Sequence, residues 1–277
     1  MILPTIEDVL RRALAEDLAG GDVTSEACIV QETHWRATAV AKQELVVCGV
    51  ELAARVFALV DPSLTFAAAV ADGAHVKKGE IIYRVSGSAR SLLMAERTAL
   101  NFMQQLSGVA TKTRAHVDAR ALGSKTRITD TRKTTPGLRT LERYAVRCGG
   151  GHNHRDNLGS AVLIKDNHVR AAGGVTAAIE RSRAHAPHTS RIECEVTTLT
   201  ELDEAIAAGA DVILLDNMSD DMTAQAIART AGRAFLEASG GITLERIGTL
   251  SRLGVDAISV GALTHSAPAV DISLEFE

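Results

Sequence analysis

The pattern of hydrophobic and polar positions divides the chain into two parts of different texture. In the first part, up to about residue 108, helical and strand patterns are mixed irregularly. Apolar side chains recur at helical spacing in 5–19 and 49–60. Strand patterns occupy 35–47, 64–70 and the second half of 72–87. This mixture predicts a small α+β sandwich.

A long helical pattern leads into the second part. Residues 89–121 are strongly helical, with a break expected at Gly108. From about residue 109 onward, short apolar runs alternate with Ala-rich helical segments, which is typical of a parallel sheet covered by helices. The predicted strands are 127–132, 162–166, 192–196, 212–216, 235–238 and 257–261.

Polar or glycine residues recur where these strands end, and this repetition favours a barrel. They are Arg132 and Lys133, Lys165 and Asp166, Glu195, Asp216, Ser239 and Gly261. In an α/β barrel such positions converge on one rim, whereas a doubly wound sheet concentrates its chemistry near one switch point. Six strands are fewer than the usual eight. We therefore predict an α/β protein with an N-terminal α+β sandwich and a C-terminal incomplete, six-stranded α/β barrel.

The patterns also suggest where the domains begin and end. We expect an N-terminal domain over 1–108 and a barrel domain over 109–265. The final motif DISLEFE alternates apolar and polar residues, so 266–277 is expected to return to the first domain as a strand.

Charge marks one segment of the chain as unusual. Residues 127–170 hold 9 Lys/Arg and 4 Asp/Glu, or +5, although the whole chain has a net charge of −4. A concentrated cationic segment in an acidic chain indicates an anionic ligand. A pI near 6.2 and an aromatic content of 3% argue against nucleic-acid binding.

Cysteine spacing and hydropathy bear on the compartment. The four cysteines, Cys28, Cys48, Cys148 and Cys194, show no CxxC spacing and are expected to be reduced thiols. The first residues lack the apolar run of a signal peptide. No stretch approaches the roughly 18 apolar residues of a membrane span. We expect a cytoplasmic protein with no membrane partner.

Several cations of the basic segment follow predicted strands. Arg132 offers a planar fork for carboxylate or phosphate and Lys133 a point charge, although both could be surface charges. Lys165 ends an apolar strand, where a salt bridge to Asp166 or Glu195 is the alternative. Outside the segment, Arg97 has the pattern of a solvated helix charge.

The motif GGGHNHR at 149–155 combines glycines with histidines. Its three glycines let the backbone approach a ligand closely, and His154 and Arg155 follow them. His152 and His154 form an HxH pair that could also bind a metal, with His168 nearby. No carboxylate–His grouping recurs later, so the metal site is the weaker interpretation.

Acidic residues and small-residue turns follow the later strands. Glu195 and Asp216 could hold Mg²⁺, accept hydrogen bonds from sugar hydroxyls, or pair with the cations. Backbone N–H groups in the turns ASGG and SVGA can bind phosphate. These turns contain Ser239, Gly240, Gly241 and Gly261.

Together, these motifs resemble the quinolinate phosphoribosyltransferase family. The resemblance rests on TRKTTPGLR, YAVRCGGGHNHR, VLIKDNH, ECEV, ILLDN, EASGG and SVGALTHS, and extends through EDLAGGDVTSE and ERTALNFMQQLSGVAT to essentially the whole chain. It implies an open N-terminal sandwich and a head-to-tail homodimer whose active site is shared across subunits. It also implies that quinolinate and phosphoribosyl pyrophosphate become nicotinate mononucleotide, CO₂ and pyrophosphate with Mg²⁺, in de novo NAD biosynthesis.

The resemblance further implies roles for individual residues. The residues implied to bind the quinolinate carboxylates are Arg132, His154, Arg155 and Lys165. Those implied to bind the 5′-phosphate are Ser239, Gly240, Gly241 and Gly261, with His265 close by. Lys133 would assist at the pyrophosphate, and Arg97 would come from the neighbouring subunit. Glu195 and Asp216 would meet ribose hydroxyls and Mg²⁺, directly or indirectly, and with Lys133 and Lys165 form the catalytic set.

Three other functions stay open at this point. One is a metal-dependent barrel hydrolase that uses His152 and His154, which tightly bound zinc would favour. Another is a related phosphoribosyltransferase-like protein of the molybdenum-transport type, although GGGHNHR and LIKDNH look more like the quinolinate enzyme. The third is a non-catalytic sensor of phosphoribosyl or pyridine-carboxylate compounds, which only a turnover assay excludes.

Overall fold

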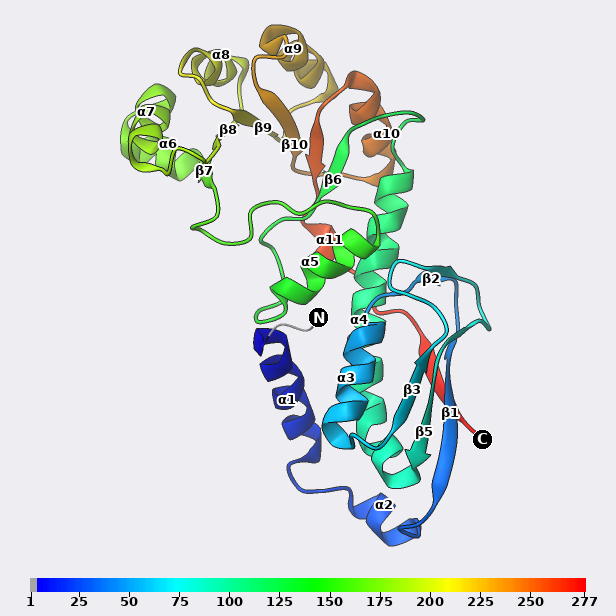
Figure 1. Cartoon of the computed structure of the whole chain (residues 1–277). Coiled ribbons are helices and arrows are strands. Elements are labelled where there is room, and N and C mark those ends of the chain that lie inside the picture. Colours follow the sequence, from blue (N-terminus) through cyan, green and yellow to red (C-terminus); the bar gives the residue numbers. More distant parts are fainter. Residues whose placement is uncertain (1–3) are drawn as a thin grey trace. The chain divides into compact units, whose positions relative to one another are not determined.

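The computed structural model describes residues 4–277, which form two compact units (Figure 1). The first unit combines the residues up to Arg114 with Thr134–Gly150 and Ala262–Glu277. The second consists of Ala115–Lys133 and Gly151–Gly261. The units therefore interleave along the chain, whereas the sequence predicts one boundary near residue 108 and a returning terminal segment.

The first unit is built on a four-stranded antiparallel sheet. Its strands lie in the order β12 (Ile272–Phe276), β1 (His34–Ala41), β5 (Ile81–Ser88) and β3 (Thr65–Ala68). The register of β12 with β1 runs from Ala37↔Phe276 to Ala41↔Ile272, so DISLEFE forms part of this sheet. The strand predicted over 35–47 is divided, because Leu45–Val46 (β2) instead pairs with His75–Val76 (β4).

Helices and aromatic packing complete the first unit. Its helices are α1 (Pro4–Leu18), α2 (Val23–Cys28), α3 (Val50–Val60), α4 (Ala89–Asp118, up to Arg114), α5 (Arg139–Cys148) and α11 (Ala262–His265). Phe57 of α3 packs on Phe66 and Tyr83 of the sheet, with ring centroids 6.1 and 6.0 Å away. Burial of Tyr83 raises the pKa of its hydroxyl. Large apolar side chains at the helical and strand spacings predicted thus form the core of this unit.

The break predicted at Gly108 is wrong, because α4 continues from Ala89 to Asp118. A Cβ at Gly108 would lie 2.1 Å from the carbonyl oxygen of Pro268. The glycine therefore allows the segment before β12 to approach the helix closely, and helix propensity alone misjudges its role.

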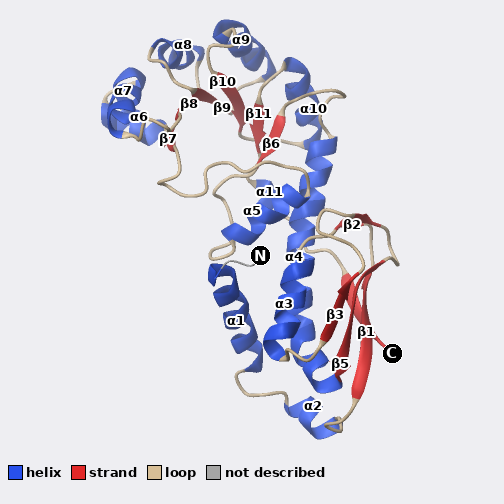
Figure 2. Ribbon diagram, viewed as in Figure 1, coloured by secondary structure: helices blue, strands red, loops and turns tan. Residues whose placement is uncertain are grey.

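The second unit contains a six-stranded parallel sheet (Figure 2). Its order is β6 (Arg127–Thr129), β11 (Ala257–Ser259), β10 (Phe235–Ser239), β9 (Val212–Asp216), β8 (Ile192–Val196) and β7 (Val162–Ile164). Its helices are α6 (Asp166–Ala172), α7 (Val175–His185), α8 (Leu199–Ala207), α9 (Asp220–Thr230) and α10 (Leu244–Leu253), and α7 to α10 lie side by side along the sheet. The prediction of an incomplete, six-stranded α/β barrel is confirmed.

The alternation along β8 determines where its acidic side chains lie. Ile192, Cys194 and Val196 belong to the apolar core shared with α7 and α8. Successive strand side chains point to opposite faces, so Glu193 and Glu195 share the face turned away from these helices. One strand thus supplies both packing for the helices and carboxylates for the interior.

The cysteines form no disulfide. Ligand atoms of Cys48, Asp72 and Cys148 lie within 4.8 Å of one another in the first unit. Asp72 is already engaged there, since it accepts the N–H groups of Gly49 and Val50 before α3. The nearby Cys148 thiol and burial both raise the pKa of Cys48. Within residues 4–277, no helix has the length and apolarity that crossing a membrane requires.

Candidate active site

The carboxyl ends of β7 and β8 bring Lys165 and Glu195 together. The Lys165 ammonium forms an ion pair with Glu195 Oε2. The Lys165 side chain is 46% exposed and that of Glu195 11% exposed, so the pair lies at the surface of the sheet edge. This is the salt bridge left open as an alternative from the sequence.

His168 holds the backbone of Lys165 in place. Its Nδ1 accepts the Lys165 N–H at 2.9 Å, at the start of α6. The ring therefore serves the local turn, and His168 belongs to neither cluster with metal-like spacing among the described residues.

The next strand ends place Asp216 beside Ser239. These two residues are register partners at the ends of β9 and β10. Gly240 follows with φ of +85°, and a Cβ there would lie 2.2 Å from Asn217 Oδ1. The positive φ favours glycine, and any larger residue would also displace the Asn217 side chain that follows β9. Its neighbour Gly241 has φ of +58°, and the turn leads directly into α10.

A second glycine turn follows the neighbouring strand. Gly261 comes two residues after the end of β11, which lies between β6 and β10. Since these strands are parallel, both glycine turns lie at the same sheet edge as Lys165 and Glu195.

Asp130 connects the end of β6 to the GGGHNHR motif. It is fully buried. Its Oδ1 accepts the His154 N–H at 2.7 Å, and its Oδ2 accepts Asn153 Nδ2 at 2.6 Å. Arg132 follows as a half-buried residue and Lys133 as an exposed one. The sequence analysis missed Asp130, which gives no signal beyond its place at a strand end.

His154 lies between two buried glutamates. Its Nε2 is 3.2 Å from Glu193 Oε2 and 3.5 Å from Glu237 Oε1. Its Nδ1 accepts the N–H of Arg155 at 2.7 Å. Burial opposes a charge on the ring, but the two carboxylates outweigh it and raise the pKa of His154.

The sequence analysis also missed Glu193 and Glu237. Their exposures are only 6% and 4%. Burial, followed by the repulsion of Glu193, raises the pKa of Glu237 to about 7. One signal could have found Glu193, because it shares the alternation of Glu195 on β8. A charged residue inside the apolar strand FLEAS is a similar, weaker signal for Glu237.

Two guanidinium groups gather near this network. Burial and the neighbouring charge of Arg132 lower the pKa of Arg155, whereas Glu193 raises it. Arg155 also donates from Nη1 to the carbonyl of Ala161 at 3.2 Å. Close like charges favour an anion between or beside them.

The two histidines of the HxH pair have different surroundings. His152 forms a backbone bridge to Thr129 beside β6. Burial and the charges of Arg127 and Arg120 lower the pKa of its side chain. His152 is not part of the cluster that contains His154.

Two clusters among the described residues have ligand spacing for a metal, namely Cys48–Asp72–Cys148 and His154–Glu193–Glu237. Glu195 and Asp216 belong to neither. As carboxylates on adjacent strands they still suit Mg²⁺, which commonly takes one or two protein carboxylates together with substrate phosphates.

Two predicted site residues belong to the first unit. Arg97 is exposed on α4. His265 ends α11, is exposed, and has its Nδ1 2.6 Å from Ser266 Oγ.

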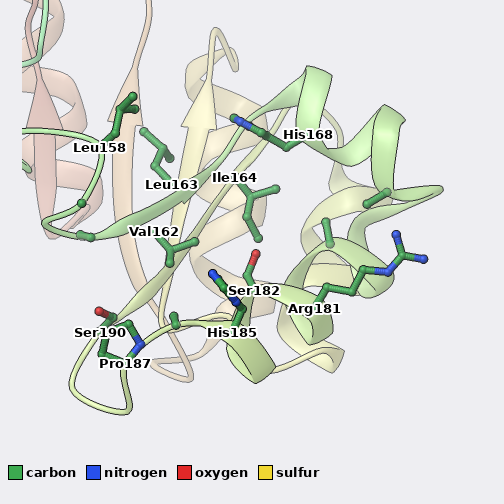
Figure 3. A pocket seen from close by; sticks show the side chains of 15 residues that line it. Leu158, Val162, Leu163, Ile164, His168, Arg181, Ser182, His185, Pro187 and Ser190 are labelled. Carbon is green, nitrogen blue, oxygen red and sulfur yellow. The ribbon is translucent and has the colours of Figure 1, made fainter.

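A cavity of about 500 Å³ lies beside β7, the edge strand of the parallel sheet (Figure 3). Its lining includes Val162 and Ile164 of β7 and Ser182 and His185 of α7. Of the candidate site residues, His168 alone lines it, and none of the residues expected to bind substrate does. The candidate active site is therefore the polar sheet edge and not this cavity.

Cations, carboxylates and glycine turns at the carboxyl edge of a parallel sheet define a class: α/β-barrel enzymes that act on anionic, phosphate-bearing substrates. The chain belongs to the quinolinate phosphoribosyltransferase family. The model of the family's N-terminal domain matches residues 22–107, and that of its C-terminal domain matches residues 109–275.

Curated relatives and solved structures agree with this membership. The probable nicotinate-nucleotide pyrophosphorylase [carboxylating] of Bacillus subtilis is 44% identical over 98% of this chain and 93% of its own. The Mycobacterium leprae enzyme of that name is also 44% identical, over 97% and 96%. The structure of NadC from Streptococcus pyogenes is 43% identical, covers 100% of this chain and 99% of its own, and has a TM-score of 0.95.

Proposed function

We propose that this enzyme transfers the phosphoribosyl group of phosphoribosyl pyrophosphate to quinolinate, with decarboxylation to nicotinate mononucleotide, CO₂ and pyrophosphate. Membership of the family supports this reaction. The observation that carries it is the collection of opposite charges and glycine turns at one sheet edge, from Arg132 to Gly261. Such an edge suits a dicarboxylate and a phosphorylated sugar together.

Quinolinate would be bound by cations. Arg132, Arg155 and Lys165 offer the charges that two adjacent carboxylates need, and His154 lies next to Arg155. The ion pair between Lys165 and Glu195 would loosen when a substrate carboxylate competes for the ammonium.

Phosphoribosyl pyrophosphate would occupy the neighbouring strand ends. The turns containing Ser239, Gly240, Gly241 and Gly261 would bind its 5′-phosphate, and Lys133 its pyrophosphate. Glu195 and Asp216 would accept hydrogen bonds from the ribose hydroxyls and hold Mg²⁺ directly or through water. When bound, Mg²⁺ would supply positive charge against the leaving pyrophosphate.

The chemistry requires positioning more than a protein nucleophile. The pyridine nitrogen would attack ribose C1 as pyrophosphate leaves, through a transition state with oxocarbenium character. Lys133 would offset charge on the leaving group. The resulting positive nitrogen would stabilise the electron pair left on the adjacent ring carbon when the 2-carboxylate leaves as CO₂, and a proton from water would then bind that carbon to complete nicotinate mononucleotide. Holding two substrates in this geometry supplies much of the acceleration.

We further propose that the enzyme is a homodimer in which Arg97 reaches the partner's site. Its exposure on α4 supports this, since an exposed guanidinium is accessible to an anionic substrate bound to another subunit. We also retain the expectation of a cytoplasmic location, supported by the absence of disulfides among its cysteines.

A direct assay tests the reaction. Purified protein is mixed with phosphoribosyl pyrophosphate, Mg²⁺ and either quinolinate or nicotinate, and mononucleotide, CO₂ and pyrophosphate are measured. We expect equimolar products from quinolinate. Product from nicotinate but not from quinolinate would overturn the proposal, as would no product from either acid.

Variants then test the residue roles. Arg132→Ala and Lys165→Ala should each lower kcat/KM for quinolinate by roughly 100-fold or more, because each removes a charge-assisted contact. Arg229→Ala is a matched control, since Arg229 forms an exposed ion pair with Asp203 on the helices. Normal quinolinate turnover in either site variant, with the fold intact, would refute the assigned role.

A further inference from the structure

The hydrogen bonds of His154 define the position of its ring proton. Nδ1 accepts the backbone N–H of Arg155 at 2.7 Å and so must present its lone pair. The proton of the ring is therefore on Nε2. Nε2–H then donates to Glu193 Oε1 at 3.4 Å, and Glu193 Oε2 and Glu237 Oε1 lie 3.2 and 3.5 Å from Nε2.

The two glutamates beside this N–H group are costly to bury. Both are more than nine-tenths buried, on β8 and β10. Within residues 4–277, Glu237 Oε1 is a buried oxygen without a hydrogen-bond partner, although it is directed at His154. Apolar side chains would fill the same interior at lower cost, so stability does not explain the pair.

The consequence of the network is a fixed backbone at residues 154–155. Asp130 accepts the N–H of His154, and the His154 ring accepts the N–H of Arg155. The glutamates hold the far side of the same ring. These three contacts restrain the backbone from which the Arg155 side chain extends. The guanidinium of Arg155 lies near enough to that of Arg132 to feel its charge.

The same three side chains also have the spacing of a metal site. A cation bound there is the alternative to the hydrogen-bonded ring. It would replace the proton on Nε2, and the hydrogen-bond geometry of the ring gives that nitrogen a donor role. Measurement of the metal content distinguishes a bound cation from a hydrogen-bonded Nε2–H group.

We propose that Glu193 and Glu237 are positioning residues: Glu193 accepts the hydrogen bond of His154 Nε2–H and Glu237 attracts the same ring edge by its charge. Together they orient the imidazole, and through it the backbone that presents Arg155 to quinolinate. This inference rests on the proposed function, because it assigns the pair to the acid-binding half of that site. Neither glutamate touches substrate in this scheme.

Steady-state kinetics test the inference with two replacements of Glu193. Glu193→Leu removes the acceptor, and we expect KM for quinolinate to rise roughly tenfold or more while KM for phosphoribosyl pyrophosphate changes little. Glu193→Gln keeps an acceptor oxygen and should return KM for quinolinate to within about threefold of the wild-type value. Glu237→Leu should act in the same direction as Glu193→Leu. Unchanged KM for quinolinate in both leucine variants would overturn the inference.

A matched control separates positioning from stability. Asp211 accepts the N–H of Ile192 at the opposite end of β8. Asp211→Ala should lower the midpoint of thermal unfolding without a selective change in either KM. A selective rise in KM for quinolinate in this control would mean that any weakening of β8 has the effect, and would contradict a specific role for Glu193.

Two measurements do not depend on turnover. Nitrogen-15 NMR of the histidine rings should show His154 protonated at Nε2 and unprotonated at Nδ1 in wild type, with this preference lost in Glu193→Leu. Metal analysis of the purified protein should find no stoichiometric ion removed by that substitution. The opposite tautomer, or such an ion, would refute the scheme. If wild type fails to convert quinolinate, the proposed function fails, and the NMR result still reports on the network.

Discussion

At the scale of single residues, Glu237 shows how burial raises the pKa of a carboxyl group. Its pKa rises from 4.5 to about 7, with burial as the main cause. The folded state therefore binds this proton more tightly than the unfolded state. The contribution of the protonated Glu237 to the free energy of unfolding is therefore complete below about pH 4.5. It is lost as the pH rises through about 7.

This shift predicts the effect of Glu237→Gln on stability. In wild type, the Glu237 contribution to the free energy of unfolding should fall by about 3 kcal/mol between pH 4.5 and 8. Glutamine has no proton to lose, so the variant should show a smaller decline. Denaturant unfolding of both proteins across this range measures the difference. Parallel curves would show that Glu237 does not titrate in this window.

At the strand ends the structure shows an alternative that the sequence left open, whereas the acidic residues inside the strands were not predicted. The pairing of Lys165 with Glu195 was anticipated because both follow apolar runs. Glu193 and Glu237 lie inside such runs, where a sequence pattern indicates packing and cannot show which distant side chain compensates a buried charge. Their partner His154 comes from a loop about 39 positions before Glu193.

Among the elements, the strand–helix order of the second unit was predictable and the continuity of α4 was not. Parallel strands covered by helices leave a repeated apolar signature. Gly108 weakens a helical pattern by its propensity. Its contact with Pro268, 160 positions later, is visible only in the fold.

The two helical glycines Gly108 and Gly248 should therefore respond in opposite ways to alanine. Gly108→Ala forces a backbone carbonyl away and should destabilise the protein by about 2 kcal/mol or more. At Gly248 of α10, a methyl carbon would lie 3.4 Å from its nearest neighbours, which is an ordinary contact. Gly248→Ala should be neutral or stabilise by up to about 1 kcal/mol. Thermal and denaturant unfolding check both, and equal effects would contradict the close approach at Gly108.

For the whole molecule, a shared active site can be tested by mixing inactive subunits. Arg97→Ala and Lys165→Ala homodimers should each have little activity. After subunit exchange, half of the dimers would be mixed and each would contain one intact site, so about a quarter of wild-type activity should return. Assays before and after co-refolding measure this recovery.

The matched control mixes Arg132→Ala with Lys165→Ala. Both changes affect the same side of the proposed site, so no combination of subunits restores an intact one. Recovery in this control, or none in the Arg97 mixture when mixed dimers are present, would contradict the contribution of Arg97 from the partner.

The pairing of β1 with β12 has a consequence for how the chain reaches its fold. Lys42, next to β1, meets Glu275 of β12 across 233 positions of sequence. During synthesis, one edge of β1 stays unpaired until the residues between β1 and β12 have been translated. Exposed strand edges promote association between chains. Slow translation or a high concentration of nascent chains should therefore lower the yield of folded enzyme. This loss should be larger than the stability of the folded protein alone would predict.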